Sequence, residues 1–215
     1  VIGVFMLLFG TNFNLYYLLF LGGIWSVLKS QELRWYLGIV GVSVALITLD
    51  ILPLYGENPF QSFRYAFFQV SSTITTTGYT TADYSQWPVF SQTILVLIMF
   101  VGAMAGSTGG GMKVSRVAIL FKNAMRGLRS MLCPRSVRAL KFEGKVIDGQ
   151  TLGGINCFFT AYVLLFALSV LLMSLDQYDL VSNFTAVTAC FNNIGPALGI
   201  CGPAGSYAPF SDLSK

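Results

Sequence analysis

Four apolar segments constrain this chain more strongly than any other feature, because each is long enough to enter or cross a lipid bilayer. About 20 consecutive apolar residues suffice for a helical crossing. Inside lipid, every backbone N–H and C=O group needs a partner. Charged residues make up only 10% of the 215 residues, against about a quarter in soluble domains. The sequence therefore predicts an all-α integral membrane protein.

The expected membrane helices cover residues 1–28, 35–54 and 147–175, and a further one begins near Pro88. Two shorter apolar helices, expected at 60–72 and 181–191, can enter the bilayer but not cross it. Nine of the thirteen basic residues lie between Lys113 and Lys145. The positive-inside rule therefore predicts that this stretch is cytoplasmic.

A run of hydroxyl residues follows the first short helix. We name residues 75–79, Thr-Thr-Thr-Gly-Tyr, the Thr–Gly segment. Non-helical backbone at membrane depth persists only where protein buries it or where it lines a watery path. Carbonyl groups along such a path would replace the hydration shell of an ion, as in a potassium-channel filter. On these residues alone, an ordinary external loop is the alternative.

The same order of elements occurs a second time. The second short helix ends in Asn-Asn-Ile-Gly-Pro, residues 192–196, which we name the Asn–Gly segment. Setting Gly78 against Gly195 gives an offset of 117 residues. Membrane repeats commonly bind their ion or substrate at the interface between repeats. Two short helices that both end in glycine-containing backbone favour a carbonyl-lined filter over an external loop.

Residues 102–111, which we name the glycine-rich loop, interrupt the apolar segment that begins near Pro88. A helix from Pro88 to Val101 rises about 20 Å, less than the bilayer thickness of about 30 Å, so the loop is expected inside the membrane. It is not a nucleotide-binding P-loop, because that motif has Lys directly after its last Gly, and here Met112 intervenes. A gate beneath the filter and a structural kink remain as interpretations.

These stretches resemble the TrkH/KtrB family of potassium-translocating membrane subunits, with TrkH the more similar. The residues that carry the resemblance are the Thr–Gly segment, residues 102–113 and residues 190–196. The family implies repeated units of membrane helix, pore half-helix, filter loop and membrane helix around a central pore. Of these units we expect a partial set, consisting of the last helix of a preceding unit (1–28), one complete unit (33–132), a basic cytoplasmic loop (133–148) and a partial last unit (149–215).

The resemblance implies a K⁺ selectivity filter and an intramembrane gate. The expected filter residues are Thr75, Thr76, Thr77, Gly78, Tyr79, Asn192, Asn193, Ile194 and Gly195. Among them, the backbone carbonyls of Thr76, Thr77, Asn193 and Ile194 are expected to bind K⁺, with Tyr79 as an anchor behind them. The expected gate residues are Gly102, Gly106, Ser107, Thr108, Gly109, Gly110, Gly111 and Lys113.

The expected function is K⁺ translocation across the inner cell membrane, as the pore-forming subunit of a Trk-type uptake system and without an enzymatic step. No covalent cofactor is expected, and nucleotide is expected only on a separate regulatory subunit. The alternative function is a secondary transporter with broken helices that carries a small solute. That alternative needs an acid within the membrane, and only Asp50 comes near.

Two partners are expected besides the lipid bilayer, and nucleic acid is not among them. The resemblance implies a TrkA-like cytoplasmic ring that binds nucleotide, and a homodimer of the membrane subunit. Arg126, Arg129, Arg135 and Arg138 are the expected docking residues for the ring. For the same basic stretch, anionic lipid and a solvated loop without any partner are the alternatives.

Overall fold

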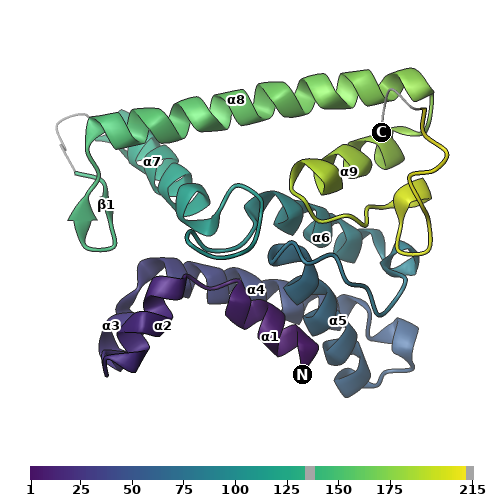
Figure 1. The fold of residues 1–215 in the computed structure, drawn as a ribbon, viewed down its shortest axis with the longest axis horizontal. Helices are drawn as coiled ribbons and strands as arrows, with labels where there is room; N and C mark the ends of the chain where they lie inside the picture. The colour runs from purple at the N-terminus through teal and green to yellow at the C-terminus, as the bar shows by residue number, and fades with distance from the viewer. Residues whose placement is uncertain (134–138, 212–215) are drawn as a thin grey trace.

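The structure, a computed structural model, describes residues 1–133 and 139–211 and is almost entirely helical (Figure 1). The α-helices are α1 (Ile2–Phe9), α2 (Phe13–Phe20), α3 (Ile24–Lys29), α4 (Gln31–Asp50), α5 (Pro59–Ile74), α6 (Val89–Val101), α7 (Val114–Leu132), α8 (Gly149–Met173) and α9 (Leu180–Phe191). Short 3-10 helices lie between them, η1 (Pro53–Tyr55), η2 (Tyr84–Gln86), η3 (Ser174–Asp176) and η4 (Gly199–Cys201). Strands β1 (Lys141–Phe142) and β2 (Lys145–Val146) form a small antiparallel hairpin that the sequence did not predict.

The main core lies between α4, α5 and α6. On α4, the buried side chains of Tyr36, Val40, Val44 and Ile47 recur at helical spacing, so they form one apolar face. This face packs against buried residues of α5 and α6, including Val70. The core therefore fixes the direction of α5, whose end begins the Thr–Gly segment.

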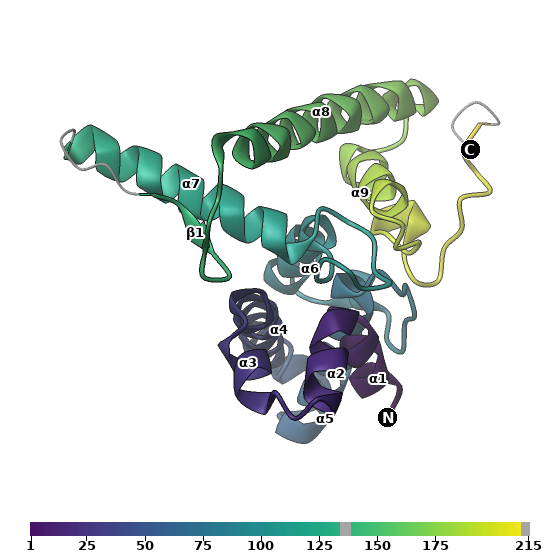
Figure 2. The same cartoon turned by 60° about the vertical axis from the view of Figure 1, so that its left-hand side comes forward.

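Helices α8 and α9 form a second pair, with α8 along one edge of the molecule and α9 beside it (Figures 1 and 2). Three aromatic rings join this pair to α6. The ring centroid of Phe166 lies 5.2 Å from that of Phe100 and 5.2 Å from that of Phe184. Edge-to-face rings at such distances attract each other beyond the effect of burial alone. The cluster therefore sets the spacing between the two parts of the fold.

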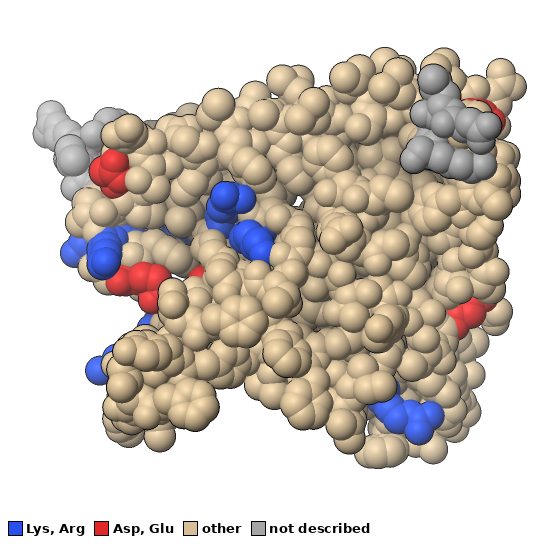
Figure 3. Space-filling view, viewed as in Figure 1, with Lys and Arg blue, Asp and Glu red and all other residues tan. Residues whose placement is uncertain are grey.

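Two helices are long and apolar enough to cross a membrane, α4 over 20 residues and α8 with η3 over 28 residues. A third crossing results if the bent pair α1 and α2 counts as one span. Most of α8 is exposed, including the apolar side chains of Leu164, Leu168 and Leu171. The face in Figure 3 is largely uncharged, with charged residues chiefly toward its two ends. Exposed apolar surface of this extent is typical of contact with lipid.

The prediction of one continuous helix over residues 1–28 is wrong. The chain turns by 94° between α1 and α2. The Asn12 side chain starts the second helix, because its Oδ1 accepts a hydrogen bond from the Asn14 N–H at 2.9 Å. Backbone groups at this break bond to the glycine-rich loop, with the Phe13 N–H donating to the Gly106 carbonyl at 3.2 Å. A cap at Asn12 and contacts with the loop thus divide the expected helix in two.

Candidate functional site

Helix α5 directs the chain toward the Thr–Gly segment. Its start follows local sequence rules, since the Asn58 side chain accepts a hydrogen bond from the Gln61 N–H and Pro59 occupies the first turn. Its last six residues, 69–74, are all buried. The segment that follows therefore begins inside the protein and emerges from it, since Thr75 is buried and Thr77 is exposed.

The Thr–Gly segment folds back on the end of α5. The Thr77 N–H donates to the Ser72 carbonyl at 2.9 Å, and the Thr76 N–H donates to the Thr73 carbonyl at 3.1 Å. Thr76 has a φ of +54° and Gly78 a φ of +78°. Left-handed backbone is uncommon for any residue but Gly, Asn or Asp. Two such residues so close together define an unusual backbone path.

The Asn–Gly segment has the same backbone path at the end of α9. The Ile194 N–H donates to the Ala189 carbonyl at 2.8 Å, and the Asn193 N–H donates to the Cys190 carbonyl at 3.0 Å. Asn193 has a φ of +59° and Gly195 a φ of +104°. Both hydrogen bonds and both left-handed residues recur at the same offset of 117 residues. The two segments thus share backbone geometry although their side chains differ.

Helix α9 begins at Asp179, whose Oδ2 accepts a hydrogen bond from the Ser182 N–H at 3.0 Å. Hydrogen bonds from the Ser182 side chain and backbone hold the pKa of Asp179 below its usual value. At the other end, Asn192 is fully buried. Its Oδ1 accepts from the Tyr162 hydroxyl at 2.6 Å and its Nδ2 donates to the Thr188 carbonyl at 2.8 Å. Asn192 therefore fixes the start of the Asn–Gly segment to α8 and α9.

The two segments touch directly. A Cβ built on Gly78 would lie 2.0 Å from the Ile194 carbonyl oxygen. Only glycine fits there, both for this contact and for its positive φ. Nearby, the Tyr84 hydroxyl donates to the Ala197 carbonyl at 2.8 Å. Backbone of the two segments is therefore in van der Waals contact at the expected filter glycine.

The glycine-rich loop lies against both segments. The Gly110 N–H donates to the Thr76 Oγ1 at 2.6 Å. A Cβ built on Gly109 would lie 3.1 Å from the Thr75 carbonyl oxygen, and one on Gly110 would lie 2.6 Å from the Asn192 carbonyl oxygen. Backbone approaches this close need glycine. The structure thus brings together three stretches that are far apart in sequence.

Lys113 bounds the loop and folds back over it. Its Nζ donates a hydrogen bond to the Gly109 carbonyl, and its backbone has a φ of +76°. The ammonium group therefore belongs to the loop and does not extend away from it. Gly102, at the other end, leaves α6 with a φ of +71° and packs against Gly111. Close glycine contacts thus bring the two ends of the loop together.

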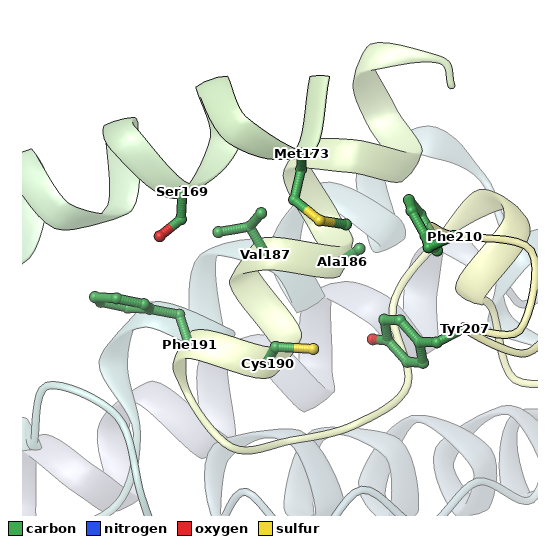
Figure 4. Close-up of a pocket in the computed structure, with 8 residues that line it drawn as sticks. All are labelled: Ser169, Met173, Ala186, Val187, Cys190, Phe191, Tyr207 and Phe210. Carbon is green, nitrogen blue, oxygen red and sulfur yellow. The ribbon is translucent and has the colours of Figure 1, made fainter. Parts of the chain in front are cut away.

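A cavity of about 310 Å³ lies behind the Asn–Gly segment (Figure 4). Its walls come from α8, α9 and the stretch after η4, and the lining residues are Ser169, Met173, Ala186, Val187, Cys190, Phe191, Tyr207 and Phe210. The Tyr207 hydroxyl donates to the Gly195 carbonyl at 2.5 Å. The cavity wall therefore helps to hold the segment, while its lining is mostly apolar and offers little to an ion.

Comparisons with known proteins identify the family of this chain. The family model for TrkH, described as a cation transport protein, matches residues 56–215. The chain belongs to the TrkH family. The Trk system potassium uptake protein TrkH of Escherichia coli K12 is 36% identical over 220 aligned positions, which cover 100% of this chain and 44% of that protein. TrkH of Salmonella typhimurium is 34% identical, with the same coverage.

A solved structure of the family is similar as well. The crystal structure of the potassium transporter TrkH from Vibrio parahaemolyticus matches with a TM-score of 0.83 at 34% identity, over 92% of this chain and 43% of that chain. The chain thus spans less than half the length of the TrkH relatives that it matches. Membership in the TrkH family makes it an integral membrane protein, in agreement with its apolar helices.

The threonine side chains of the Thr–Gly segment make contacts of their own. The Thr75 hydroxyl donates to the Ser71 carbonyl at 2.6 Å and lies 2.9 Å from the Thr77 hydroxyl. The Thr76 hydroxyl accepts from the loop. These hydroxyl contacts hold the segment. Within this chain the Tyr79 side chain is 61% exposed, and its role as an anchor stays a prediction.

The expected docking residues lie partly in a groove beside α7. Its cavity volume is about 1030 Å³, and Lys122, Arg126 and Arg129 line it together with the aromatic rings of Trp35 and Phe121. Arg126 also donates to the Asn123 Oδ1 at 2.8 Å. Arg135 and Arg138 lie outside the described residues.

Sequence reasoning missed Glu32 and the Tyr162–Asn192 pair. Glu32 stands in a short polar link, where an acid at the first turn of a helix is ordinary. Yet it is buried and bonds to the glycine-rich loop at Ala105. Tyr162 lies within a long apolar run, and its hydroxyl was the one available signal of a buried polar partner.

Proposed function

We propose that this chain forms part of a K⁺ pathway in a Trk-type uptake system, with the Thr–Gly and Asn–Gly segments as two parts of its selectivity filter. One observation carries the proposal. The two segments share a backbone path, are in direct contact, and each follows the buried end of a helix. Selectivity filters bind K⁺ through backbone carbonyls, so side-chain identity can differ between segments. K⁺ is the transported ion, and the carbonyls of Thr76, Thr77, Asn193 and Ile194 are its proposed ligands.

The family context supports the choice of K⁺. The relatives from E. coli and Salmonella are potassium uptake proteins by name, and the Vibrio relative is a potassium transporter. Binding and release of an ion by oxygen ligands needs no nucleophile or general base. The chain has no His residue, which is compatible with transport without an enzymatic step. Repeated units around one pore, of which this chain holds two pore helices, are part of the same proposal.

We propose further that the glycine-rich loop is the gate of this pathway. Its support is the proximity of Gly109 and Gly110 to the carbonyls of Thr75 and Asn192, one from each segment. A loop of small residues can occupy the space beneath a filter and leave it again at low steric cost. Displacement of the loop requires loss of the bond between the Gly110 N–H and Thr76. Opening of the proposed gate therefore breaks at least this hydrogen bond.

The secondary-transporter alternative loses its main candidate residue. The Asp50 Oδ2 accepts hydrogen bonds from the Ser91 N–H at 3.1 Å and from the Ser91 hydroxyl at 2.6 Å. Asp50 thus caps α6 rather than facing a solute site. The Gly109–Thr75 and Gly110–Asn192 contacts also leave no room for a solute between the loop and these carbonyls.

A flux assay with the intact protein in liposomes tests both proposals. We expect K⁺ uptake that Na⁺ does not replace, and faster K⁺ uptake after deletion of residues 106–109, since the shortened loop can no longer reach both segments. A matched deletion of the exposed residues 20–22 at the end of α2, whose backbone bonds stay within that turn, is the control for general damage. Solute-coupled transport without K⁺ flux would favour the alternative, and slower K⁺ uptake in the loop deletion would contradict the gate.

For partners, we propose a TrkA-like regulatory ring at the cytoplasmic end, together with a homodimer of the membrane subunit. The support for the ring is the groove beside α7, where Arg126 and Arg129 carry positive charge next to Trp35. Aromatic and Arg residues are enriched where protein interfaces gain most of their binding energy. Nucleotide is proposed only for the ring.

A further inference from the structure

Glu32 is a buried carboxylate that binds the glycine-rich loop. It lies in the first turn of α4 and is only 6% exposed. Its Oε1 accepts a hydrogen bond from the Ala105 N–H at 2.7 Å. Burial of a carboxylate costs free energy unless the carboxylate is hydrogen-bonded. The bond from the Ala105 N–H therefore offsets part of the cost of burying Glu32.

The same carboxylate also contacts the far side of the loop. Ser115, in the first turn of α7, lies close to this carboxylate with both its backbone N–H and its hydroxyl. The N-terminus of a helix favours a negative charge, because its free N–H groups point outward. Ala105 lies within the loop and Ser115 just after it. One side chain of α4 thus holds the loop and the helix that follows it.

Glu32 is not needed to start its own helix. The Ser30 side chain already accepts a hydrogen bond from the Leu33 N–H at 3.3 Å, which is the usual helix-start contact. The Glu32 side chain instead points away from α4 to partners more than 70 positions later in the chain. Its contacts therefore serve the loop.

The backbone of Glu32 meets a second carboxylate, from the cytoplasmic hairpin. Its N–H donates to the Glu143 Oε1 at 2.7 Å, and the Ser30 hydroxyl donates to the same oxygen at 3.0 Å. Glu143 is in the turn between β1 and β2 and has a φ of +50°. The start of α4 therefore lies between the hairpin and the loop, bonded to both.

We propose that Glu32 is a positioning residue that holds the glycine-rich loop against the two filter segments. It acts through the Ala105 N–H and the N-terminus of α7, and it touches no proposed ion ligand. Its effect on K⁺ flux rests on the proposed gate function, whereas its effect on the loop does not. Without Glu32, the loop leaves its position more often.

The test measures exposure of the loop directly. Met104 is fully buried in the loop, so a Met104→Cys reporter, which reacts only when the loop leaves its position, is introduced into the intact protein after the other cysteines are replaced by alanine. The rate of reaction with a charged methanethiosulfonate reagent is then measured in detergent. Glu32→Gln should raise this rate roughly fivefold, because Gln keeps an acceptor for the Ala105 N–H but loses the charge that makes this bond about twice as strong.

Two further variants keep the test decisive if Glu32→Gln folds poorly. Ser115→Ala removes the hydroxyl that lies beside the Glu32 carboxylate and should raise the reaction rate by a smaller factor. Glu57→Gln is the matched control, because Glu57 is an exposed carboxylate in the turn between η1 and α5; its rate should equal that of the parent. A rate unchanged in both Glu32→Gln and Ser115→Ala overturns the proposal.

K⁺ flux in liposomes separates this inference from the gate itself. If Glu32→Gln raises both the reaction rate and the K⁺ flux, with the K⁺/Na⁺ permeability ratio unchanged, Glu32 positions a gate. If the reaction rate rises while the flux stays the same, Glu32 still positions the loop and the gate proposal fails. A lower permeability ratio with an unchanged reaction rate contradicts the inference, because it means that Glu32 acts on the filter.

Discussion

Replacement of Gly78 by alanine tests whether contact between the Thr–Gly and Asn–Gly segments sets ion selection. The added Cβ would lie 2.0 Å from the Ile194 carbonyl oxygen, whereas real Cβ atoms essentially never approach another atom closer than 3.0 Å. One of the two backbones must therefore move by at least the difference, about 1 Å. Alanine at the φ of +78° adds a strain of roughly 1–2 kcal/mol.

This displacement exceeds what an ion site tolerates. Binding groups have to stay within about 0.5 Å of their productive geometry. A polar contact with a charged group contributes about 1.5–3 kcal/mol. Loss of one such contact at the Ile194 carbonyl should therefore lower the K⁺/Na⁺ permeability ratio by at least roughly tenfold. The ratio is measured as the reversal potential of the intact protein in planar bilayers with K⁺ and Na⁺ on opposite sides.

Two glycines serve as matched controls for Gly78→Ala. Gly22 has a φ of +80° and nothing within 4 Å of its built Cβ, so Gly22→Ala carries the same backbone strain without the clash and should keep the parent ratio. Gly195, with a φ of +104° and likewise nothing within 4 Å, should have an intermediate effect. If Gly78→Ala folds and transports with the parent ratio, the contact between the segments does not set ion selection and the filter assignment of Gly78 fails.

Two further predictions concern stability and docking. Asn192→Ala should lower the free energy of unfolding by about 1–3 kcal/mol, because it leaves the buried Tyr162 hydroxyl without its acceptor and removes the side-chain bond to the Thr188 carbonyl, which keeps only its backbone donor. Thermal unfolding in detergent measures this loss, Tyr162→Phe should cost less, and equal stability of all three proteins would contradict the role of Asn192. Replacing both Arg126 and Arg129 with Gln should abolish co-purification with the regulatory ring while K⁺ flux of the membrane subunit alone stays unchanged. Retained co-purification, together with weaker binding to vesicles of anionic lipid, would identify lipid as the partner instead.

The parts of the fold that depend on length and apolar content could be predicted from sequence. The structure has α4 and α8 as membrane-length helices, and α9 begins and ends within one residue of its predicted bounds. Helix α6 ends at Val101, directly before the glycine-rich loop. These features follow from local rules, since a helix needs a run of suitable residues and stops at glycine.

The misses all depend on contacts between distant parts of the chain. Asn12 breaks the first helix because the glycine-rich loop, more than 90 residues later, bonds to the backbone groups that the break exposes. Glu32 looked like an interfacial acid because its partner Ala105 lies 73 residues away. No periodicity in a sequence encodes such pairings.

Some residues of the candidate site could likewise be recognised from the sequence, and others could not. The glycines at 78 and 195 could be recognised because a required positive φ limits the choice of residue. The positive φ of Thr76 could not, because threonine gives no signal for left-handed backbone. That conformation became visible only through its match with Asn193, a residue type that adopts it more readily.

The shared backbone of the two segments limits how each can change over generations. At position 193 a residue that accepts a positive φ keeps the path, whereas position 76 must also accept a hydrogen bond from the Gly110 N–H. Gly78 is limited further, because its neighbours in space, Ile194 and Pro196, belong to the other segment. A larger residue at 78 would require a compensating shift 116 positions away, at Ile194. At Gly78, therefore, the two segments must change together or not at all.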